Sequence, residues 1–215
     1  MKKIKTGDGS YTFVDDKYGE VLHSITGAEE EAIKKYAEPT NIAELAMKGE
    51  INILDVCFGV GYNSAAAIDA ALKANSKCKI NILGLEVNDK LLGLVDELTP
   101  KFKSYGFIRE IKNNSYKDNN ITIQLIFGDA RKTIKKVKGE FDVCFLDPFS
   151  PKTQPEMWTE EFFKDIAAKL KTGAVLATYS CATPVRINLV RAGFDVKDGP
   201  SIGRRAPSTI ATKVL

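Results

Sequence analysis

Four acidic residues close, or closely follow, the apolar runs that the sequence predicts as parallel strands. They are Asp55, Glu86, Asp129 and Asp147. In an open α/β sheet a ligand binds beyond the carboxyl ends of the strands, so these carboxylates are candidates for one shared site. A carboxylate can accept hydrogen bonds from ribose hydroxyls or from an amine. The chemistry indicated is the binding of a nucleoside-containing ligand beside a reactive nitrogen.

A glycine-containing turn follows the first of these strands. Gly59 and Gly61 precede a predicted helix that begins near Ser64. Absent side chains let the backbone approach a ligand closely, and the helix N-terminus offers free N–H groups. A G-x-G pair alone fits a tight strand-to-helix turn as well as a ligand site. Ser64 stands where a dinucleotide-binding turn usually has its third glycine, which favours S-adenosylmethionine (SAM) over NAD.

The ends of the third and fourth strands narrow the chemistry further. Asp129 can accept a hydrogen bond from an adenine amino group, or it can cap the helix that follows. Asp147-Pro148-Phe149 places a carboxylate, a rigid turn and an aromatic side chain together. A carboxylate beside a backbone carbonyl can hold an amine and aim its lone pair at the methyl group of SAM. We therefore predict that Asp147 positions an amine and accepts its proton; the alternative is an Asp-Pro turn with a core phenylalanine.

The elements that must position these residues follow an α/β pattern. Short apolar runs alternate with helical stretches from residue 51 onward, which is typical of a mostly parallel sheet with helices on both faces. The fold predicted for residues 50–215 is a Rossmann-like domain with a seven-stranded sheet. Its expected strands are 51–56, 80–87, 121–127, 141–146, 174–179, 194–196 and 209–212. Its expected helices are 64–74, 90–105, 132–137, 158–170 and 184–192, and residues 113–120 are expected to form an exposed loop.

Residues 1–49 are predicted to be a small N-terminal elaboration. Two β-prone runs, 11–14 and 20–23, flank turn residues and predict a hairpin. Residues 26–29 fit a capping box for a helix that Pro39 ends, and a second short helix is expected over 41–47.

Composition limits the function classes. The chain has 215 residues, of which 44% are hydrophobic and 27% are charged, and this composition fits an ordinary globular domain. Its net charge of +3 is too small to indicate a dedicated nucleic-acid binder. The basic start lacks the apolar core of a signal peptide and no apolar run reaches membrane-spanning length, so a cytoplasmic protein without a membrane partner is expected. Its four cysteines lie far apart and are expected to be reduced. With His23 as the one histidine, no metal site is expected; His23 is predicted to end the hairpin and to line a pocket.

Together these motifs resemble the methyltransferase family that completes the modification of the tRNA wobble uridine, forming 5-methylaminomethyl-2-thiouridine. The resemblance begins near residue 23 and depends on residues 55–63, 84–86 and 128–131, and chiefly on 146–159, L-D-P-F-S-P-K-T-Q-P-E-M-W-T. That stretch is similar to the family pattern D-x-F-x-P-x-x-N-P-x-x-W. The chain departs from the family at Cys57, where glycine is usual, at Asp55, where glutamate is common, and at Gln154, which replaces asparagine.

The resemblance implies a class I SAM-dependent methyltransferase that uses SAM to methylate the amine of 5-aminomethyl-(2-thio)uridine. It implies tRNA as the substrate and other enzymes that supply the aminomethyl group, without the oxidase domain fused to some relatives. The residues it implies for catalysis are Asp147, Pro148 and Phe149. Those implied for the cofactor are Asp55, Phe58, Gly59, Gly61, Asn63, Glu86, Val87, Asp129, Ala130 and Asp147. The candidates for contacts with tRNA phosphates are Lys152, Arg204 and Arg205. The lysines at 132, 135, 136 and 138 are further candidates, although such a charge run fits a solvated helix face as well. Trp158 is expected either to stack on the wobble base or to pack at the start of a helix.

Three other functions stay open at the level of sequence. Residues 147–149 also resemble the D/N-P-P-Y/F motif of amino methyltransferases that act on adenine or protein amides, although the second proline is missing. A polyamine aminopropyltransferase shares the acidic strand ends, but its extra carboxylates near Asp147 are not evident. Cys57 in the glycine turn keeps open a non-catalytic scaffold that binds SAM or RNA.

Overall fold

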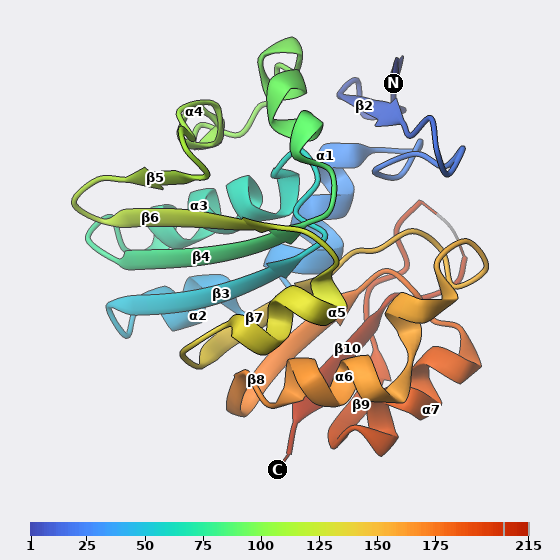
Figure 1. Cartoon of the computed structure of the whole chain (residues 1–215). Helices are drawn as coiled ribbons and strands as arrows, with labels where there is room; N and C mark the ends of the chain where they lie inside the picture. Colours follow the sequence, from blue (N-terminus) through green and yellow to red (C-terminus); the bar gives the residue numbers. More distant parts are fainter. Residues whose placement is uncertain (204, 215) are drawn as a thin grey trace.

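A computed structural model describes residues 1–203 and 205–214, and a mixed sheet of eight strands forms the centre of this part of the chain (Figure 1). The strand order is β5–β6–β4–β3–β7–β8–β10–β9. The middle five strands are parallel, whereas β5 is antiparallel to β6 and β10 is antiparallel to both β8 and β9. Their bounds are β3 Glu50–Val56, β4 Lys79–Glu86, β5 Ser115–Lys117, β6 Ile121–Phe127, β7 Phe141–Leu146, β8 Leu170–Thr178, β9 Phe194–Asp198 and β10 Thr209–Lys213. The predicted Rossmann-like fold is confirmed.

The sheet has one strand more than predicted, because β5 forms within residues 113–120, which were expected to be a loop. Three polar-rich residues are too short a run to show strand periodicity, but the edge of β6 offers free backbone groups to pair with. The Tyr116 ring of β5 also packs against Phe107, with ring centroids 5.3 Å apart. The strand therefore forms by tertiary contact with an existing edge.

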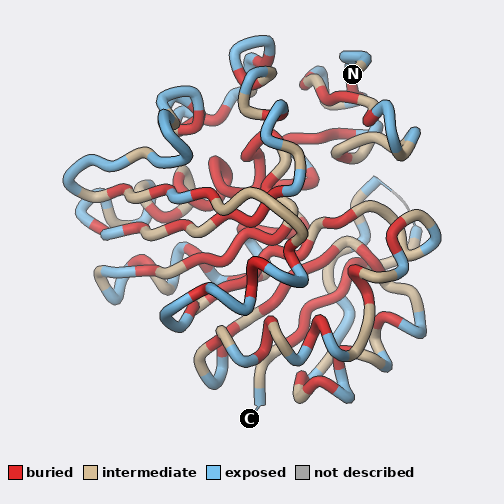
Figure 2. Tube along the Cα trace, viewed as in Figure 1, coloured by how far each residue is buried: buried red, intermediate tan, exposed pale blue. Residues whose placement is uncertain are grey.

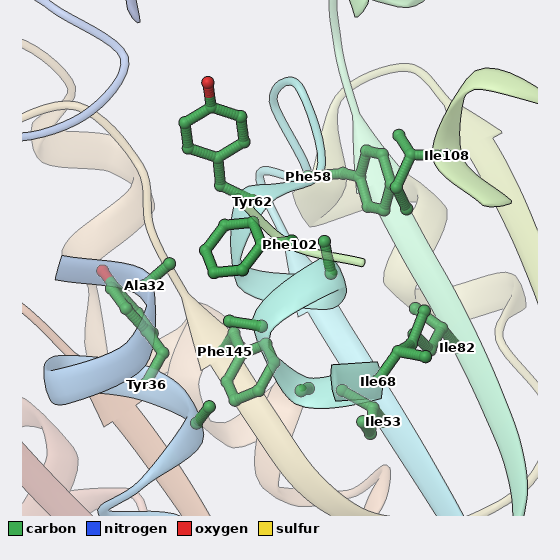
Figure 3. Packing of buried hydrophobic residues seen from close by; sticks show 14 of the residues in the cluster. Ala32, Tyr36, Ile53, Phe58, Tyr62, Ile68, Ile82, Phe102, Ile108 and Phe145 are labelled. Carbon is green, nitrogen blue, oxygen red and sulfur yellow. The ribbon is translucent and has the colours of Figure 1, made fainter. Parts of the chain in front are cut away.

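Helices cover both faces of the sheet and bury two apolar layers. Ile51 and Ile53 of β3 belong to one layer, and Leu54 and Val56 belong to the other. Figure 2 shows buried backbone along the central strands of the sheet. The first layer is closed by α1 (Ala28–Glu31), the π-helix η1 (Ala32–Ala37), α2 (Ile42–Ala46), α3 (Tyr62–Ala74) and α4 (Tyr105–Arg109). The second is closed by α5 (Ala130–Thr133), η3 (Ile134–Lys136), η4 (Pro155–Trp158), α6 (Glu160–Ala167) and α7 (Thr183–Arg191). In the first layer Tyr36 meets Phe145 edge to face (Figure 3).

The helix expected over residues 90–105 is broken. The structure has a 3₁₀ helix, η2 (Asp89–Glu97), and then α4 after an irregular segment. Leu98 already has extended backbone angles. Pro100 lies within the expected helix, where it removes a backbone donor and disfavours helical geometry at the residue before it. The break therefore follows from Pro100, which the spacing of apolar residues alone does not take into account.

In the N-terminal hairpin, residues 11–14 pair mainly with a strand that precedes them and not with residues 20–23 as expected. β1 (Lys2–Lys5) pairs with β2 (Tyr11–Val14), and the expected partner, residues 20–23, adds only a bridge from Val14 to Val21 and a hydrogen bond from the Leu22 N–H to the Phe13 carbonyl, 2.9 Å. β1 is a lysine-rich edge strand that carries no apolar pattern. The Lys3 ammonium lies 4.7 Å from the centre of the Tyr11 ring, which covers one face of this ribbon.

The predicted capping box is also wrong, because Gly27 precedes α1 and no side chain of its own caps the helix. Asp8, from the turn between β1 and β2, replaces it: its Oδ2 accepts the Glu30 N–H at 3.0 Å. The Glu29 carboxylate instead accepts the Lys101 N–H at 3.1 Å. The cap therefore comes from another element and ties the hairpin to α1. Within the described ranges, none of the helices is both long enough and apolar enough to cross a membrane.

Candidate active site

Three adjoining cavities lie beyond the carboxyl ends of β3, β4, β6 and β7. The central cavity, about 240 Å³, is bordered by Cys57, Gly59, Glu86, Asp147 and Phe149, among others. The β6-side cavity, about 220 Å³, reaches residues 128–131 and shares Cys57 and Val87 with it. The η1-side cavity, about 230 Å³, lies against η1 and shares Asp147 and Phe149 with it. The predicted acidic strand ends thus border cavities that share lining residues, except Asp55, which lines none of the three.

The turn after β3 requires left-handed backbone at three positions. Cys57 has φ of 69°, Gly59 of 59° and Gly61 of 80°. At Gly61 a Cβ atom would lie 2.8 Å from the Ile108 side chain and 2.9 Å from the Phe58 ring, so only glycine fits there. These two side chains are labelled in Figure 3. Phe58 itself is 3% exposed and packs in the core, so it shapes the turn from beneath.

Cys57 occupies a position whose backbone favours glycine, which explains the glycine usual in the family resemblance. We expect Cys57→Gly to be more stable than Cys57→Ala by about 1 kcal/mol, because both remove the sulfur but only alanine keeps a Cβ in the left-handed region. Urea unfolding of the two variants measures the difference. An alanine variant as stable as the glycine variant would show that this turn relaxes without strain.

Glu86, at the end of β4, holds the glycine turn in place. Its Oε2 accepts the Gly59 N–H at 2.9 Å, and its Oε1 accepts the N–H groups of Val87 at 2.7 Å and Asn88 at 2.9 Å. Burial raises the pKa of this carboxyl. Two carboxylate oxygens can accept about four hydrogen bonds, so one acceptor position remains for a ligand hydroxyl. The next residue, Val87, also lines the central cavity but is 59% exposed, whereas Glu86 is buried.

Asp55 and Asn63 lie under the glycine turn rather than at the cavity surface. Asp55 is fully buried, its Oδ2 accepts the Ser64 hydroxyl at 2.6 Å, and burial raises its pKa to about 7. Asn63 donates from Nδ2 to Asp147. Among the described residues, neither Asp55 Oδ1 nor Asn63 Oδ1 has a hydrogen-bond partner. Both side chains therefore support the glycine turn from beneath.

Asp147 lies where the central and η1-side cavities meet. Its Oδ1 accepts the Tyr36 hydroxyl at 2.6 Å, and its Oδ2 accepts the Asn63 amide at 2.9 Å. Burial, with a smaller contribution from the charge of Glu31, raises the pKa of Asp147 to about 7. Each oxygen keeps a free lone pair, so the carboxylate is fixed in orientation and still able to accept from a substrate.

The rest of the Asp147-Pro148-Phe149 turn is held by two residues of the downstream signature and by Tyr179, which follows β8. The Phe149 N–H donates to Gln154 Oε1 at 3.1 Å, and the Trp158 indole N–H donates to the Phe149 carbonyl at 2.9 Å. The Tyr179 hydroxyl donates to the Pro148 carbonyl at 3.0 Å. Trp158 is 3% exposed, so the structure favours its packing role over stacking on a base.

Asp129 acts as the cap of α5. Its Oδ1 accepts the Arg131 N–H at 3.0 Å, and its carboxylate is bound by the Arg131 guanidinium at 2.9 and 2.7 Å. These contacts confirm the capping alternative. Asp129 and Ala130 also line the β6-side cavity, so an adenine contact stays a prediction.

The N-terminal segment covers the central cavity. The Glu20 carboxylate accepts the Ser150 N–H at 3.1 Å and hydroxyl at 2.7 Å, and it also binds the Thr153 hydroxyl. The Tyr18 ring packs on Phe149 at 4.9 Å. This clamp was not predicted, because no local pattern links residue 20 to residues more than a hundred positions away.

His23 lines the central and η1-side cavities, as predicted. Its ring stacks on Tyr62 with centroids 4.8 Å apart, and its Nδ1 lies 3.0 Å from the Thr12 hydroxyl. Burial lowers the pKa of His23 to about 4, so the ring is neutral near pH 7.

The described side chains that are predicted to contact RNA phosphates line none of the three cavities. Lys152 and Arg205 are exposed, and Arg204 lies outside the described residues. The lysines at 132, 135, 136 and 138 are exposed as well, and Lys135 lies 3.8 Å from Asp165 across to α6. Their roles stay predictions.

A mostly parallel sheet whose acidic strand ends surround a glycine turn defines this chain as a class I methyltransferase. It belongs to an S-adenosyl-L-methionine-dependent methyltransferase family, whose model matches residues 94–214. The cofactor is therefore SAM. Glu86 lines the central cavity, and its spare acceptor fits a ribose hydroxyl of SAM.

The chain is similar over its full length to MnmC2 from Aquifex aeolicus, with 34% identity and a TM-score of 0.90, and it covers 71% of that chain. It is 35% identical over 98% of its length to an uncharacterized protein of Methanocaldococcus jannaschii and covers 59% of that protein. It is 28% identical over 88% of its length to the tRNA 5-methylaminomethyl-2-thiouridine biosynthesis bifunctional protein MnmC of Pseudomonas putida, of which it covers 31%. The chain thus spans 31% of one of these curated relatives and 59% of the other.

Spermidine synthase from Thermotoga maritima shares the fold, with a TM-score of 0.55 and 14% identity. At that identity the likeness concerns the fold alone.

Proposed function

We propose that this protein transfers the methyl group of SAM to the primary amine of 5-aminomethyl-(2-thio)uridine at the wobble position of tRNA. The observation that carries the proposal is Asp147, fixed by Tyr36 and Asn63 at the junction between two cavities. One cavity continues toward Glu86 and the glycine turn, and the other leads away from them. A cofactor on one side and an amine on the other would meet at this carboxylate.

The residues implied by sequence take roles that agree with this arrangement. Glu86, Val87 and the glycine turn hold the cofactor, with Asp55, Phe58 and Asn63 supporting the turn from beneath. Residues 129 and 130 border the end of that space, where the adenine would lie. Residues 1–49 form an elaboration on the core of residues 50–215, and Tyr36 makes that elaboration part of the site.

The reaction needs a neutral amine. An alkylammonium with a pKa near ~10 is mostly protonated at pH 7, and about three pH units of deprotonation cost roughly 4 kcal/mol. The ammonium donates to Asp147, and its proton passes to the carboxylate, whose raised pKa makes it a better acceptor than an exposed aspartate. Bound SAM supplies an electrophilic methyl group. The amine lone pair then forms the N–C bond as the S–C bond breaks, leaving a secondary ammonium and S-adenosylhomocysteine.

The partners follow from the substrate. The protein acts on tRNA in the cytoplasm, after other enzymes have installed the aminomethyl group. The names of the MnmC relatives support this proposal. Exposed Lys152 and Arg205, together with Arg204, are proposed to contact phosphates, a contribution that salt would weaken.

The test is incubation of the protein and tritiated SAM with bulk tRNA from a strain that lacks this methyltransferase. We expect label in tRNA, and nucleoside analysis should identify the methylaminomethyl product. Label in protein would favour an amino methyltransferase of another class. In a separate incubation, turnover of decarboxylated SAM would favour an aminopropyltransferase. Labelled protein, or turnover of decarboxylated SAM, without label in tRNA would contradict the proposal.

A further inference from the structure

The η1-side cavity contains a buried ion pair that the proposed mechanism does not use. Lys35 and Glu31 border it together with Asp147. The Lys35 ammonium lies 2.8 Å from Glu31 Oε1, and the two side chains are 4% and 9% exposed. Glu31 Oε2 accepts the Ser24 N–H at 2.6 Å, so both carboxylate oxygens are engaged.

Lys35 has more donors than the protein satisfies. An ammonium carries three N–H groups, and within residues 1–203 and 205–214 its one hydrogen-bond acceptor is Glu31. Buried donors without acceptors are costly, and those of Lys35 lie beside a cavity. A ligand that offers an electron-rich oxygen here would complete the site.

A second ion pair on the same helical segment is exposed, so burial is not a general property of ion pairs on this segment. Lys34 and Glu38 have the same i,i+4 spacing and the same 2.8 Å contact, but their side chains are 45% and 54% exposed. That pair faces solvent, whereas the pair of Lys35 and Glu31 lies within reach of the substrate space. The comparison separates a role in the cavity from a general role in stabilising the helical segment.

We propose that Lys35 recognises the substrate base by donating a hydrogen bond to its O4 carbonyl oxygen. This inference rests on the proposed function. The aminomethyl group is attached to C5 of the uracil ring, and the C4 carbonyl is the neighbouring position. When the amine lies at Asp147, O4 lies on the same side of the ring, within the cavity that Asp147 and Lys35 both line. A hydrogen bond from a charged donor is also stronger than one from a neutral donor.

Lys35 is therefore a substrate-recognition residue, and Glu31 positions it. O2 lies across the ring from C5 and is not the expected acceptor. Lys35 should thus sense the atom at position 4 and be indifferent to oxygen or sulfur at position 2.

The test compares anticodon stem–loop RNAs that carry 5-aminomethyluridine, its 4-thio form or its 2-thio form. Sulfur is a weak acceptor, so in the wild-type protein we expect the 4-thio substrate to lower kcat/KM about tenfold and the 2-thio substrate to change it little. The variant is Lys35→Met with Glu31→Gln, which removes both charges and leaves no unpaired ion. It should lose about tenfold on the 4-oxo substrate and show no further loss with the 4-thio substrate.

The matched control, Lys34→Met with Glu38→Gln, should behave as the wild type on all three RNAs. The ratio between two substrates on one enzyme cancels any effect of Glu31 on the pKa of Asp147. Equal 4-thio sensitivity in the variant and the wild type would overturn the role of Lys35 and leave the proposed function standing. An absence of 4-thio sensitivity in the wild type would do the same without any variant. No methylation of any of these RNAs by the wild type would overturn both proposals.

Discussion

Asp147→Asn is expected to lower methyl transfer at pH 7 by about 10²–10³-fold while leaving the affinity for SAM nearly unchanged. Asparagine keeps the shape of the side chain and can still accept the Tyr36 hydroxyl, and the amide of Asn63 can rotate to present its unpartnered oxygen. The variant cannot take a proton. Catalysis would then depend on the small fraction of amine that is already neutral when it binds, which is about one part in 10³ at pH 7.

The pH dependence distinguishes proton acceptance from a purely structural role. Because burial raises the pKa of Asp147 to about 7, kcat/KM of the wild type should rise as the pH increases to about 7 and then level off. In Asp147→Asn it should keep rising toward the pKa of the amine near ~10, so the defect shrinks as the pH increases. A defect of constant size from pH 6 to 9 would contradict proton acceptance by Asp147.

Asp142→Asn is a matched control, because Asp142 lies near the opposite end of β7, where its carboxylate binds Lys171 at 2.7 Å. It should leave kcat/KM and its pH profile unchanged. Binding of SAM to each protein, measured by titration calorimetry, confirms that the site is folded.

The strand ends of this site could be predicted from sequence because their signals are local. Apolar runs fix where the strands stop, and parallel strands bring their carboxyl ends to one edge. Glu86 and Asp147 therefore border the same space, as expected. Asp55 also ends a strand, but its side chain is turned under the loop, where it bonds Ser64. Alternation along a strand predicts which face a residue takes and not whether a loop covers it.

The parts that sequence could not predict come from distant segments. Tyr36 binds Asp147 across 111 positions, and Glu20 binds Ser150 across 130 positions. Neither pair has a spacing that any helix or strand period could reveal. Only His23 of the N-terminal segment was predicted to line a pocket. The segment also supplies Tyr18, which packs on Phe149, Glu20, which binds Ser150, and Tyr36, which donates a hydrogen bond to Asp147.

The family signature after Asp147, together with Tyr179 after β8, acts mainly through the backbone of the turn. Gln154, Trp158 and Tyr179 each satisfy one backbone group of Pro148 or Phe149. A turn whose N–H and carbonyl groups are bound in this way cannot easily change the direction of the neighbouring carboxylate. This explains why Trp158 lies buried and bonded behind the turn, which agrees with the packing alternative and not with stacking on a base.

Glu86→Gln is expected to weaken SAM binding by about 10–100-fold. The carboxylate receives three backbone N–H groups on its two oxygens, and an amide nitrogen can accept none of them. Whichever way the glutamine turns, it must leave the N–H of Gly59, or those of Val87 and Asn88, without an acceptor. The glycine turn would loosen at the point where the cofactor must be held, and the acceptor available to a ribose hydroxyl would be weaker.

Titration calorimetry with SAM measures this loss, and thermal unfolding without SAM measures how much belongs to the fold itself. Glu50→Gln is a suitable control, because Glu50 begins β3 at the far end of the sheet, where it accepts a hydrogen bond from Asn81. It should bind SAM as the wild type does. If Glu86→Gln also bound SAM with wild-type affinity, the cofactor would have to be held by other strand ends, and the assignment of the central cavity to its ribose would be wrong. A residue that only supported the turn should lower the free energy of SAM binding and the free energy of unfolding by similar amounts. A larger loss in SAM binding than in unfolding would therefore show that Glu86 also contacts the cofactor.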